Sequence, residues 1–367
     1  MTLIDIIAGA RPNFMKIAPI ISALESREAE GGTLRYRLVH TGQHYDARMS
    51  GDFFTQLGIP EPHVNLEVGS GTQAEQTGAI MSRYESVLLE ARPDLCLVVG
   101  DVTSTMACAI AAQKLGVRVA HVEAGIRSGD WSMPEEINRL VTDAITNWFF
   151  TTSEVANANL RRAGVTDERI HFVGNTMIDT LLANLPRLRP PAFWDDLGLQ
   201  PGGYFVLTLH RPANVDEEAG LASLLAAIAS SARDLPIVFP VHPRTASTLA
   251  QMAPLPANVH VVDPQPYLEF NYLVRGARAV VTDSGGITEE TTVLGVPCMT
   301  LRATTERPET VTIGTNELLG VDPAALAPAF ERLFAGEWKT GRIPELWDGR
   351  TGTRIVAVLE SLLASRA

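Results

Sequence analysis

Short apolar runs alternate with amphipathic, helix-like stretches along this chain of 367 residues. Runs such as Leu95–Val99 and Ala279–Thr282 are apolar at nearly every position rather than at every second one. Strands of this kind are buried on both faces, which is typical of parallel sheets covered by helices on each side. The pattern therefore predicts an α/β fold built on parallel sheets.

The alternation runs through two halves, separated by a stretch rich in proline and glycine at residues 185–203. We predict two Rossmann-like, doubly wound domains at residues 1–176 and 177–352, with a last helix at 353–367 that packs back on the first domain. The predicted strands are Leu3–Ala8, Arg35–His40, Leu95–Val99, Val117–Val122, Asn147–Thr151, Ile170–Val173, Tyr204–Leu209, Ile237–Pro240, Val259–Val262, Ala279–Thr282 and Cys298–Leu301. In such folds ligands bind beyond the carboxyl ends of the strands, so we expect the active site in the cleft between the domains.

The net charge of the chain argues against a polyanionic partner. Its 42 acidic residues outnumber its 30 lysines and arginines, which gives a formal charge of −12 and no global attraction to nucleic acid or an anionic membrane. Cys96, Cys108 and Cys298 lie in apolar stretches without paired spacing, which predicts buried side chains rather than a disulfide frame or a zinc site. Because we find no signal-peptide pattern and no apolar run of membrane-spanning length, we expect a soluble cytoplasmic protein.

Two basic residues follow the first predicted strand. Arg11 and Lys16 stand at the mouth and in the first turn of a predicted helix. A positive charge there opposes the helix dipole, and an anionic ligand would resolve that conflict. The alternative is a helix start that is simply exposed to solvent. The segment lacks the G-x-G-x-x-G pattern, so it does not predict that type of dinucleotide site.

Three acidic residues are predicted at one edge of the first sheet. Asp101 and Glu123 follow apolar strands, and Glu135 lies in the first turn of a helix, where Arg139 shares its face through the i, i+4 spacing. Each alone could be structural, for example as a helix cap. Together in a cleft they predict a carboxylate cluster for general acid and base catalysis.

A glycine-rich turn in the second half suits a phosphate group. Ser284, Gly285 and Gly286 lie between an apolar strand and a helix, where free backbone N–H groups can meet a phosphate oxygen. Glu290, one turn inside the helix, could accept hydrogen bonds from ribose hydroxyls. The alternative is a tight turn with acidic residues favourably placed at a helix start.

His210 and Arg307 extend the basic set. His210 follows a strand and precedes an arginine, and Arg307 lies in the loop after the last strong strand. With Arg11 and Lys16 they form a basic group in an acidic protein. This pattern favours a small diphosphate-bearing ligand over a polymer.

Nine motifs occur in one order from about residue 3 to residue 320. They are GARPNFMKIAPI, TGQHYD, VVGDVTST, HVEAGIRSGD, MPEEINR, VGNTMID, LTLHR, TDSGGITEE and TTERPE. Together they resemble the non-hydrolysing UDP-N-acetylglucosamine 2-epimerases. The resemblance implies two Rossmann-like domains, as in the B-type glycosyltransferases. It also implies an isomerase that interconverts UDP-GlcNAc and UDP-ManNAc by anti elimination of UDP to 2-acetamidoglucal and re-addition, with no cofactor and no metal.

The resemblance also implies site residues and an assembly. The implied catalytic residues are Asp101, Glu123, Glu135, His210 and Lys16. The implied substrate-binding residues are Arg11, Lys16, Arg139, His210, Phe270, Ser284, Gly285, Gly286, Glu290 and Arg307, with Phe270 against the uracil. Relatives that have a regulatory UDP-GlcNAc site place it near Gln43 and His44, which are the candidate allosteric residues. A homodimer is expected.

Several alternatives remain open. A hydrolysing epimerase would release UDP and free ManNAc from the same intermediate, and related epimerases act on diacetamido uronic acid nucleotides. A B-type glycosyltransferase would need an acceptor cleft and has less need of three carboxylates. A non-catalytic UDP-sugar sensor belongs to a different class, and the presence of Asp101, Glu123 and Glu135 argues against it.

Overall fold

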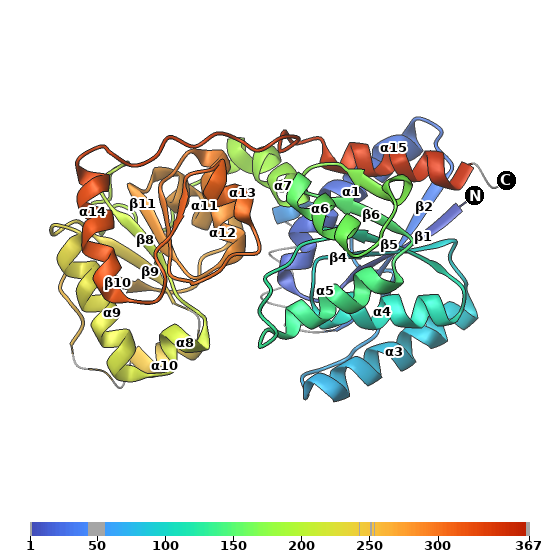
Figure 1. Ribbon diagram of the computed structural model, residues 1–367, viewed down its shortest axis with the longest axis horizontal. Coiled ribbons are helices and arrows are strands. Elements are labelled where there is room, and N and C mark those ends of the chain that lie inside the picture. Colours follow the sequence, from blue (N-terminus) through green and yellow to red (C-terminus); the bar gives the residue numbers. More distant parts are fainter. Residues whose placement is uncertain (1, 43–55, 242, 250–251, 253, 365–367) are drawn as a thin grey trace. The chain divides into compact units, whose positions relative to one another are not determined.

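The computed structural model describes residues 2–42, 56–241, 243–249, 252 and 254–364. The chain divides into two compact units, the first formed by Met1–Ala183 with Glu345–Ala367 and the second by Asn184–Pro344. Each unit is a parallel sheet with helices packed on it, as Figure 1 shows. The predicted α/β fold class is confirmed.

The first unit is built on a sheet whose described strands have the order β3-β2-β1-β4-β5-β6-β7. The strands are β1 (Thr2–Ala8), β2 (Leu34–His40), β3 (Val64–Asn65), β4 (Leu95–Val99), β5 (Arg118–Val122), β6 (Trp148–Thr151) and β7 (Ile170–Phe172). The direction of winding reverses between β1 and β4, and in doubly wound sheets such a reversal is where ligands bind.

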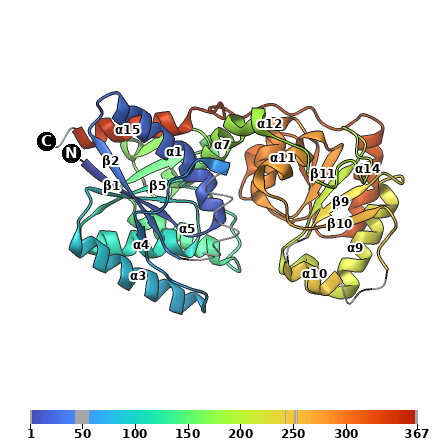
Figure 2. The ribbon, with the colours of Figure 1, turned by 180° about the vertical axis from the view of Figure 1, so that it is seen from behind.

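Helices cover both faces of this sheet, as Figures 1 and 2 show from opposite sides. One face carries α3 (Gln73–Glu90), α4 (Thr103–Lys114) and α5 (Pro134–Ile145), and the other carries α1 (Arg11–Ala29), α7 (Thr176–Asn184) and α15 (Thr351–Ala364). The helix α6 (Glu154–Arg162) connects β6 to β7. Apolar strand residues drive this packing; on the α3 side, Tyr84 and Leu88 pack in one core cluster with Val98.

The second unit repeats the scheme with the strand order β10-β9-β8-β11-β12-β13. The strands are β8 (Phe205–Thr208), β9 (Ile237–Pro240), β10 (Val259–Val262), β11 (Ala279–Thr282), β12 (Cys298–Thr300) and β13 (Asn316–Leu318). The helices are α8 (Pro212–Val215), α9 (Glu218–Ser231), α10 (Pro243–Leu249), α11 (Tyr267–Gly276), α12 (Gly285–Leu294), α13 (Pro308–Thr312) and α14 (Leu326–Phe334). Phe205 packs with α9 and α14, whereas the next residue, Val206, packs with α11. This alternation buries both faces of the sheet.

The first unit extends beyond the predicted boundary at residue 176 because α7 is bonded to it. Thr180 Oγ1 donates a hydrogen bond to the Met15 carbonyl at 2.6 Å. The chain returns at Glu345, earlier than the predicted 353, and the buried Trp347 donates from Nε1 to the Thr152 carbonyl at 3.0 Å. The C-terminal helix α15 then lies against α1.

The three cysteines are buried and free, as their apolar surroundings predict. Burial raises the pKa of the Cys298 thiol to about 12. Within the described part of the chain, no helix is both long enough and apolar enough to span a membrane.

Candidate active site

Lys16 and Glu123 form a buried ion pair at the carboxyl edge of the first sheet. Asn13, in the first turn of α1, accepts a hydrogen bond from the N–H of Gly9 and donates one to the Val99 carbonyl, each at 3.1 Å. These bonds hold the start of α1 beside the end of β4, and the Lys16 ammonium meets the Glu123 carboxylate with 10% and 2% of the two side chains exposed. Lys16 is therefore not a solvated residue at a helix start.

The backbone at Glu123 is in the left-handed region, with φ at 68°. That conformation costs a residue with a side chain about 1 kcal/mol or more, and such strain is concentrated at functional sites. The turn after the neighbouring strand is equally tight. A Cβ at Gly100, where φ is 67°, would lie 2.9 Å from Lys16 Nζ. Only glycine leaves room for the ion pair there.

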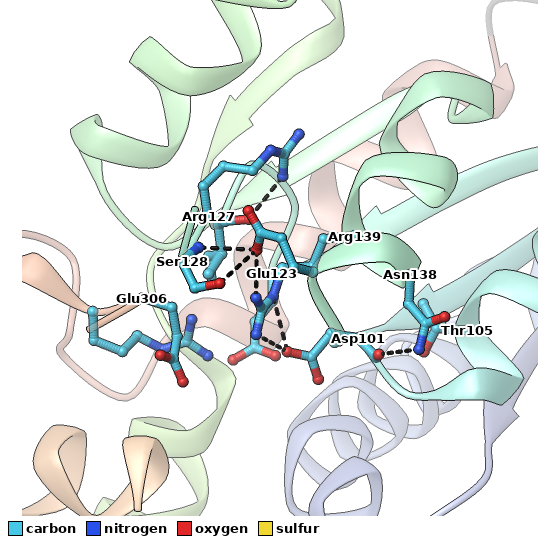
Figure 3. A network of polar contacts seen from close by, with 12 residues as sticks. Asp101, Thr105, Glu123, Arg127, Ser128, Asn138, Arg139 and Glu306 are labelled. Atoms are coloured by element: carbon cyan, nitrogen blue, oxygen red, sulfur yellow. Dashed lines mark hydrogen bonds and ion pairs between the residues drawn. The ribbon is translucent and has the colours of Figure 1, made fainter. Parts of the chain in front are cut away.

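Arg139 joins two carboxylates. Its Nε and Nη2 donate to Asp101 Oδ2 at 3.0 and 2.6 Å, and its Nη1 donates to Glu136 Oε2 at 2.7 Å. Asn138 donates to the backbone carbonyl of Asp101 at 2.8 Å. Figure 3 shows the side chains of Asn138 and Arg139 directed at Asp101. Asp101 is thus held by its side chain and by its backbone.

Glu135 is the predicted neighbour of Arg139 on the helix face, but the ion pair is made by Glu136. Glu136 also accepts hydrogen bonds from the N–H groups of Ser128 and Gly129 at 2.9 and 3.0 Å. Burial raises the pKa of Glu136, but these bonds and Arg139 outweigh it and leave the pKa below its usual value. Glu135 is half-buried and makes no hydrogen bond or ion pair with the described residues.

In the second unit, His210 is oriented by Asp283. The Nδ1 of His210 lies 2.8 Å from Asp283 Oδ1, and the imidazole is 53% exposed. Asp283 is fully buried and also accepts from the N–H of Arg211 at 2.9 Å and from Asn214 Nδ2 at 3.0 Å. Burial raises the pKa of Asp283, but His210 and these donors outweigh it and lower the pKa. Nδ1 therefore donates to a carboxylate, and Nε2 is left for a ligand.

The glycine-rich turn lies over a buried ion pair. Ser284, Gly285 and Gly286 are half-buried, and a Cβ at Gly285 would lie 2.5 Å from Glu306 Oε1. Arg302 Nη2 donates to Glu306 Oε2 at 2.5 Å. Burial opposes ionisation of Glu306, but Arg302 outweighs it and lowers the pKa of the carboxyl to about 2.

Arg307 and Glu290, both predicted ligand contacts, are buried. Arg307 donates from Nε to Glu289 Oε1 at 2.6 Å, and this partner was not predicted. Burial raises the pKa of Glu290 to about 7, although hydrogen bonds from Asn271 and Tyr267 act in the opposite direction. A carboxyl group of this kind exchanges its proton near neutral pH.

The remaining predicted site residues are Phe270, Arg11, Gln43 and His44. Phe270 lies on α11, half-buried against the core around Val206. Gln43, His44 and the side chain of Arg11 lie outside the described residues.

Several residues of these polar networks were not predicted. The most prominent are Asn13, His121, Glu136, Asn138, Asp143 and Asp283. Asp283 resembles Asp101 in sequence, since both are acidic residues within two positions of the end of an apolar strand. No local pattern marks Asn13, His121, Asn138 or Asp143, because each has a partner that is 22 to 86 residues away in the sequence. Glu136 differs, since it pairs with Arg139 three residues later, which is a helical spacing.

The comparisons with known proteins agree with one another. The sequence profile of a family described as UDP-N-acetylglucosamine 2-epimerase matches residues 27–360. A UDP-N-acetylglucosamine 2-epimerase of Methanocaldococcus jannaschii is 41% identical over 369 residues, which is 97% of this chain and 98% of that protein. A crystal structure of the M. jannaschii UDP-GlcNAc 2-epimerase in complex with UDP-GlcNAc and UDP superposes with a TM-score of 0.87 at 40% identity, covering 98% of this chain and 100% of that one.

Two further similarities concern the substrate and the fold. The UDP-2,3-diacetamido-2,3-dideoxy-D-glucuronate 2-epimerase of Pseudomonas aeruginosa is 41% identical over 318 residues, covering 86% of this chain and 87% of that protein. A calicheamicin glycosyltransferase shares the fold alone, with a TM-score of 0.58 at 16% identity over 100% of this chain and 99% of that one. The chain therefore belongs to the UDP-N-acetylglucosamine 2-epimerase family.

Proposed function

We propose that this protein interconverts UDP-N-acetylglucosamine and UDP-N-acetylmannosamine by inverting C2, without hydrolysing the nucleotide sugar. The observation that carries the proposal is the pair of ion-paired carboxylates at one sheet edge, Glu123 with Lys16 and Asp101 with Arg139. Membership of the family and the similarity to a protein bound to UDP-GlcNAc support the same substrate class.

The reaction needs groups that take and return a proton at C2. A carboxylate removes the C2 proton, the electron pair forms the C1–C2 double bond, and the bond from C1 to the UDP oxygen breaks. The products are 2-acetamidoglucal and UDP. In the second half UDP oxygen re-adds to C1 and C2 takes a proton on the opposite face. Asp101 and Glu123, which are paired with Arg139 and Lys16, are candidates for the base, and Glu135 is the third candidate carboxyl.

The departing UDP needs positive charge where its own negative charge builds up. We assign this role to Lys16, Arg11, Arg307 and His210, whose Nε2 faces away from Asp283. The turn Ser284–Gly286 offers N–H groups at the start of α12 for the diphosphate. Glu290 and Phe270 would bind the ribose and the uracil.

A second substrate is favoured by one observation. The 2-epimerase from P. aeruginosa that acts on a diacetamido glucuronate nucleotide is as similar in percentage identity as the M. jannaschii enzyme, 41% in both cases. The same elimination chemistry would apply, with a carboxylate at C6 and an acetamido group at C3 as the differences.

Proton NMR in deuterium oxide tests the proposal. Purified protein is incubated with UDP-GlcNAc and, in parallel, with the diacetamido glucuronate nucleotide. We expect UDP-ManNAc with deuterium at C2 and little free UDP, because protonation of C2 uses a solvent-exchanged proton. Accumulation of UDP with free ManNAc would assign the hydrolysing reaction. Conversion of only the diacetamido glucuronate nucleotide would identify that compound as the substrate. Binding of both nucleotide sugars without conversion of either would indicate a sensor.

Amide variants connect this activity to the carboxylates. Asp101→Asn, Glu123→Gln and Glu135→Gln should each lower kcat by at least about a hundredfold while UDP still binds. Asp94→Asn is the matched control, because Asp94 is exposed and precedes β4 at its opposite end. Loss of UDP binding in step with kcat would contradict the assigned roles.

A further inference from the structure

His121 is a buried polar residue, and the other buried residues of its strand are apolar. It lies in β5, two residues before Glu123, and its side chain is fully buried. An imidazole in such a place needs partners for its ring nitrogens, since an unpaired buried polar group is costly.

Both ring nitrogens of His121 face oxygen acceptors. Nδ1 lies 2.7 Å from Asp143 Oδ1, and Nε2 lies 2.7 Å from the carbonyl oxygen of Gly100. A backbone carbonyl only accepts hydrogen bonds, and an ionised carboxylate also only accepts. A neutral imidazole carries one N–H, so one of its lone pairs would face an oxygen at 2.7 Å. Only the doubly protonated ring satisfies both contacts.

The surroundings keep Asp143 ionised. Its Oδ2 forms an ion pair with Arg127 Nη1 at 2.6 Å and accepts from the N–H of Gly125 at 3.1 Å. Burial raises the pKa of Asp143, but His121 and Arg127 outweigh it, and the pKa is lower than usual. The carboxylate therefore accepts from His121 and cannot donate to it.

The two strands that pair with β5 bring no charged residue to the positions opposite His121. The neighbouring strands place Val98 and Phe149 opposite His121. The ionisable groups come from α5, which carries Asp143, and from the loop after β5, which carries Arg127. Beyond Gly100 lies the Lys16–Glu123 pair.

We propose that His121 is doubly protonated in the folded protein, with both ring nitrogens donating, and that it acts as a positioning residue. Its charged ring holds the carbonyl of Gly100, whose N–H is held in turn by the Val122 carbonyl at 3.0 Å. The N–H and the carbonyl of Gly100 are therefore both hydrogen-bonded to residues of β5. The next residue is Asp101, so the ring sets the place from which that carboxylate acts. The catalytic part of this inference rests on the proposed function, whereas the charge does not.

The charge is measured on the wild-type protein, without substrate. With ¹⁵N-labelled histidine, long-range ¹H–¹⁵N spectra distinguish an imidazolium from the neutral tautomers. We expect both His121 nitrogens to be protonated at about pH 7. His171 is the matched control, because burial lowers its pKa and it should stay neutral near pH 7. A neutral His121 ring at pH 7 would overturn the proposal, whatever the activity.

Two variants separate charge from position. In Asp143→Asn the ring can become neutral and still donate from Nε2 to Gly100, and its spectrum should show one unprotonated nitrogen. His121→Asn removes the bond to Gly100 and should lower kcat on the order of a hundredfold, the cost of a misplaced catalytic group, with UDP affinity within about threefold. His171→Asn should keep kcat. An unchanged kcat in His121→Asn, or an equal loss of UDP binding, would contradict the positioning role.

Discussion

At the scale of single residues, buried charges in this protein are paired with side chains of opposite charge. Lys16, Arg139 and Arg307 are buried, and each meets a carboxylate within the same unit. Removing one member of a buried pair typically costs about 3–5 kcal/mol, because the other charge stays behind. Variants of these residues should therefore be read for stability as well as for activity.

Glu290 makes stability depend on pH. Burial raises its pKa to about 7 from 4.5, so between these values the folded protein holds a proton that the unfolded chain has lost. The free energy of unfolding should therefore fall as the pH rises through this window. Over this pH window the free energy of unfolding of the wild type should fall by up to about 3 kcal/mol more than that of Glu290→Gln. Urea unfolding from pH 4.5 to 7.5 measures this, with the exposed Glu331→Gln as control. Parallel curves for wild type and Glu290→Gln would contradict it.

At the scale of elements, the turns after the strands position the site. The turns after β4 and β5 orient Asp101 and Glu123, and the turn after β11 begins α12 above the Arg302–Glu306 pair. Parallel strands place these turns at one edge of each sheet. The chemistry therefore depends on turns of a few residues held by a rigid sheet.

At the start of α12 there is no room for a methyl group at Gly285, but there is room at Gly286. In Gly285→Ala the new Cβ would lie 2.5 Å from Glu306 Oε1 and would displace the buried ion pair, so we expect a loss of about 1–3 kcal/mol. In Gly286→Ala the new Cβ would meet nothing within 4 Å, and the free energy of unfolding should rise by up to about 1 kcal/mol because alanine favours the helix. Urea unfolding compares the two, and equal stabilities would show that Glu306 moves aside freely.

At the scale of the whole molecule, the first unit contains both ends of the chain. The segment from Glu345 closes it, with Trp347 bonded to the Thr152 carbonyl and the N–H of Gly352 donating to Asp179 at 2.8 Å. Residues from the two ends of the sequence thus share one core, while the second unit is continuous from Asn184 to Pro344.

Closure of the first unit depends on a close approach of backbones. In Gly352→Ala the Cβ would lie 2.3 Å from the Pro19 carbonyl oxygen, which belongs to helix backbone and cannot yield easily. We expect a loss of about 1–3 kcal/mol and faster amide exchange in α1 and α15, with β8–β13 unchanged. Gly78→Ala in α3, where nothing lies within 4 Å, is the control. Exchange that rises equally in both units would contradict a local effect.

The elements that sequence predicts well are those with a strong local pattern. Leu95–Val99, Ile237–Pro240 and Ala279–Thr282 are strands with the predicted bounds. The edge strand β13 was not predicted, because its residues Asn316–Leu318 are few and mostly polar. The helix α3 was also missed, although Thr72 and Glu75 form a capping box at its start that could have revealed it.

The sequence by itself determined the α/β class, the family and the strand ends where the polar residues gather, because apolar periodicity and motifs are local properties. Only the tertiary structure decided which charges meet. Arg139 binds Asp101 across 38 residues, His210 binds Asp283 across 73, and Lys16 binds Glu123 across 107. Such pairs depend on the order of strands in the sheet, and no local pattern encodes that order. The protonation of His121 follows for the same reason, since its two acceptors come from different elements of the fold.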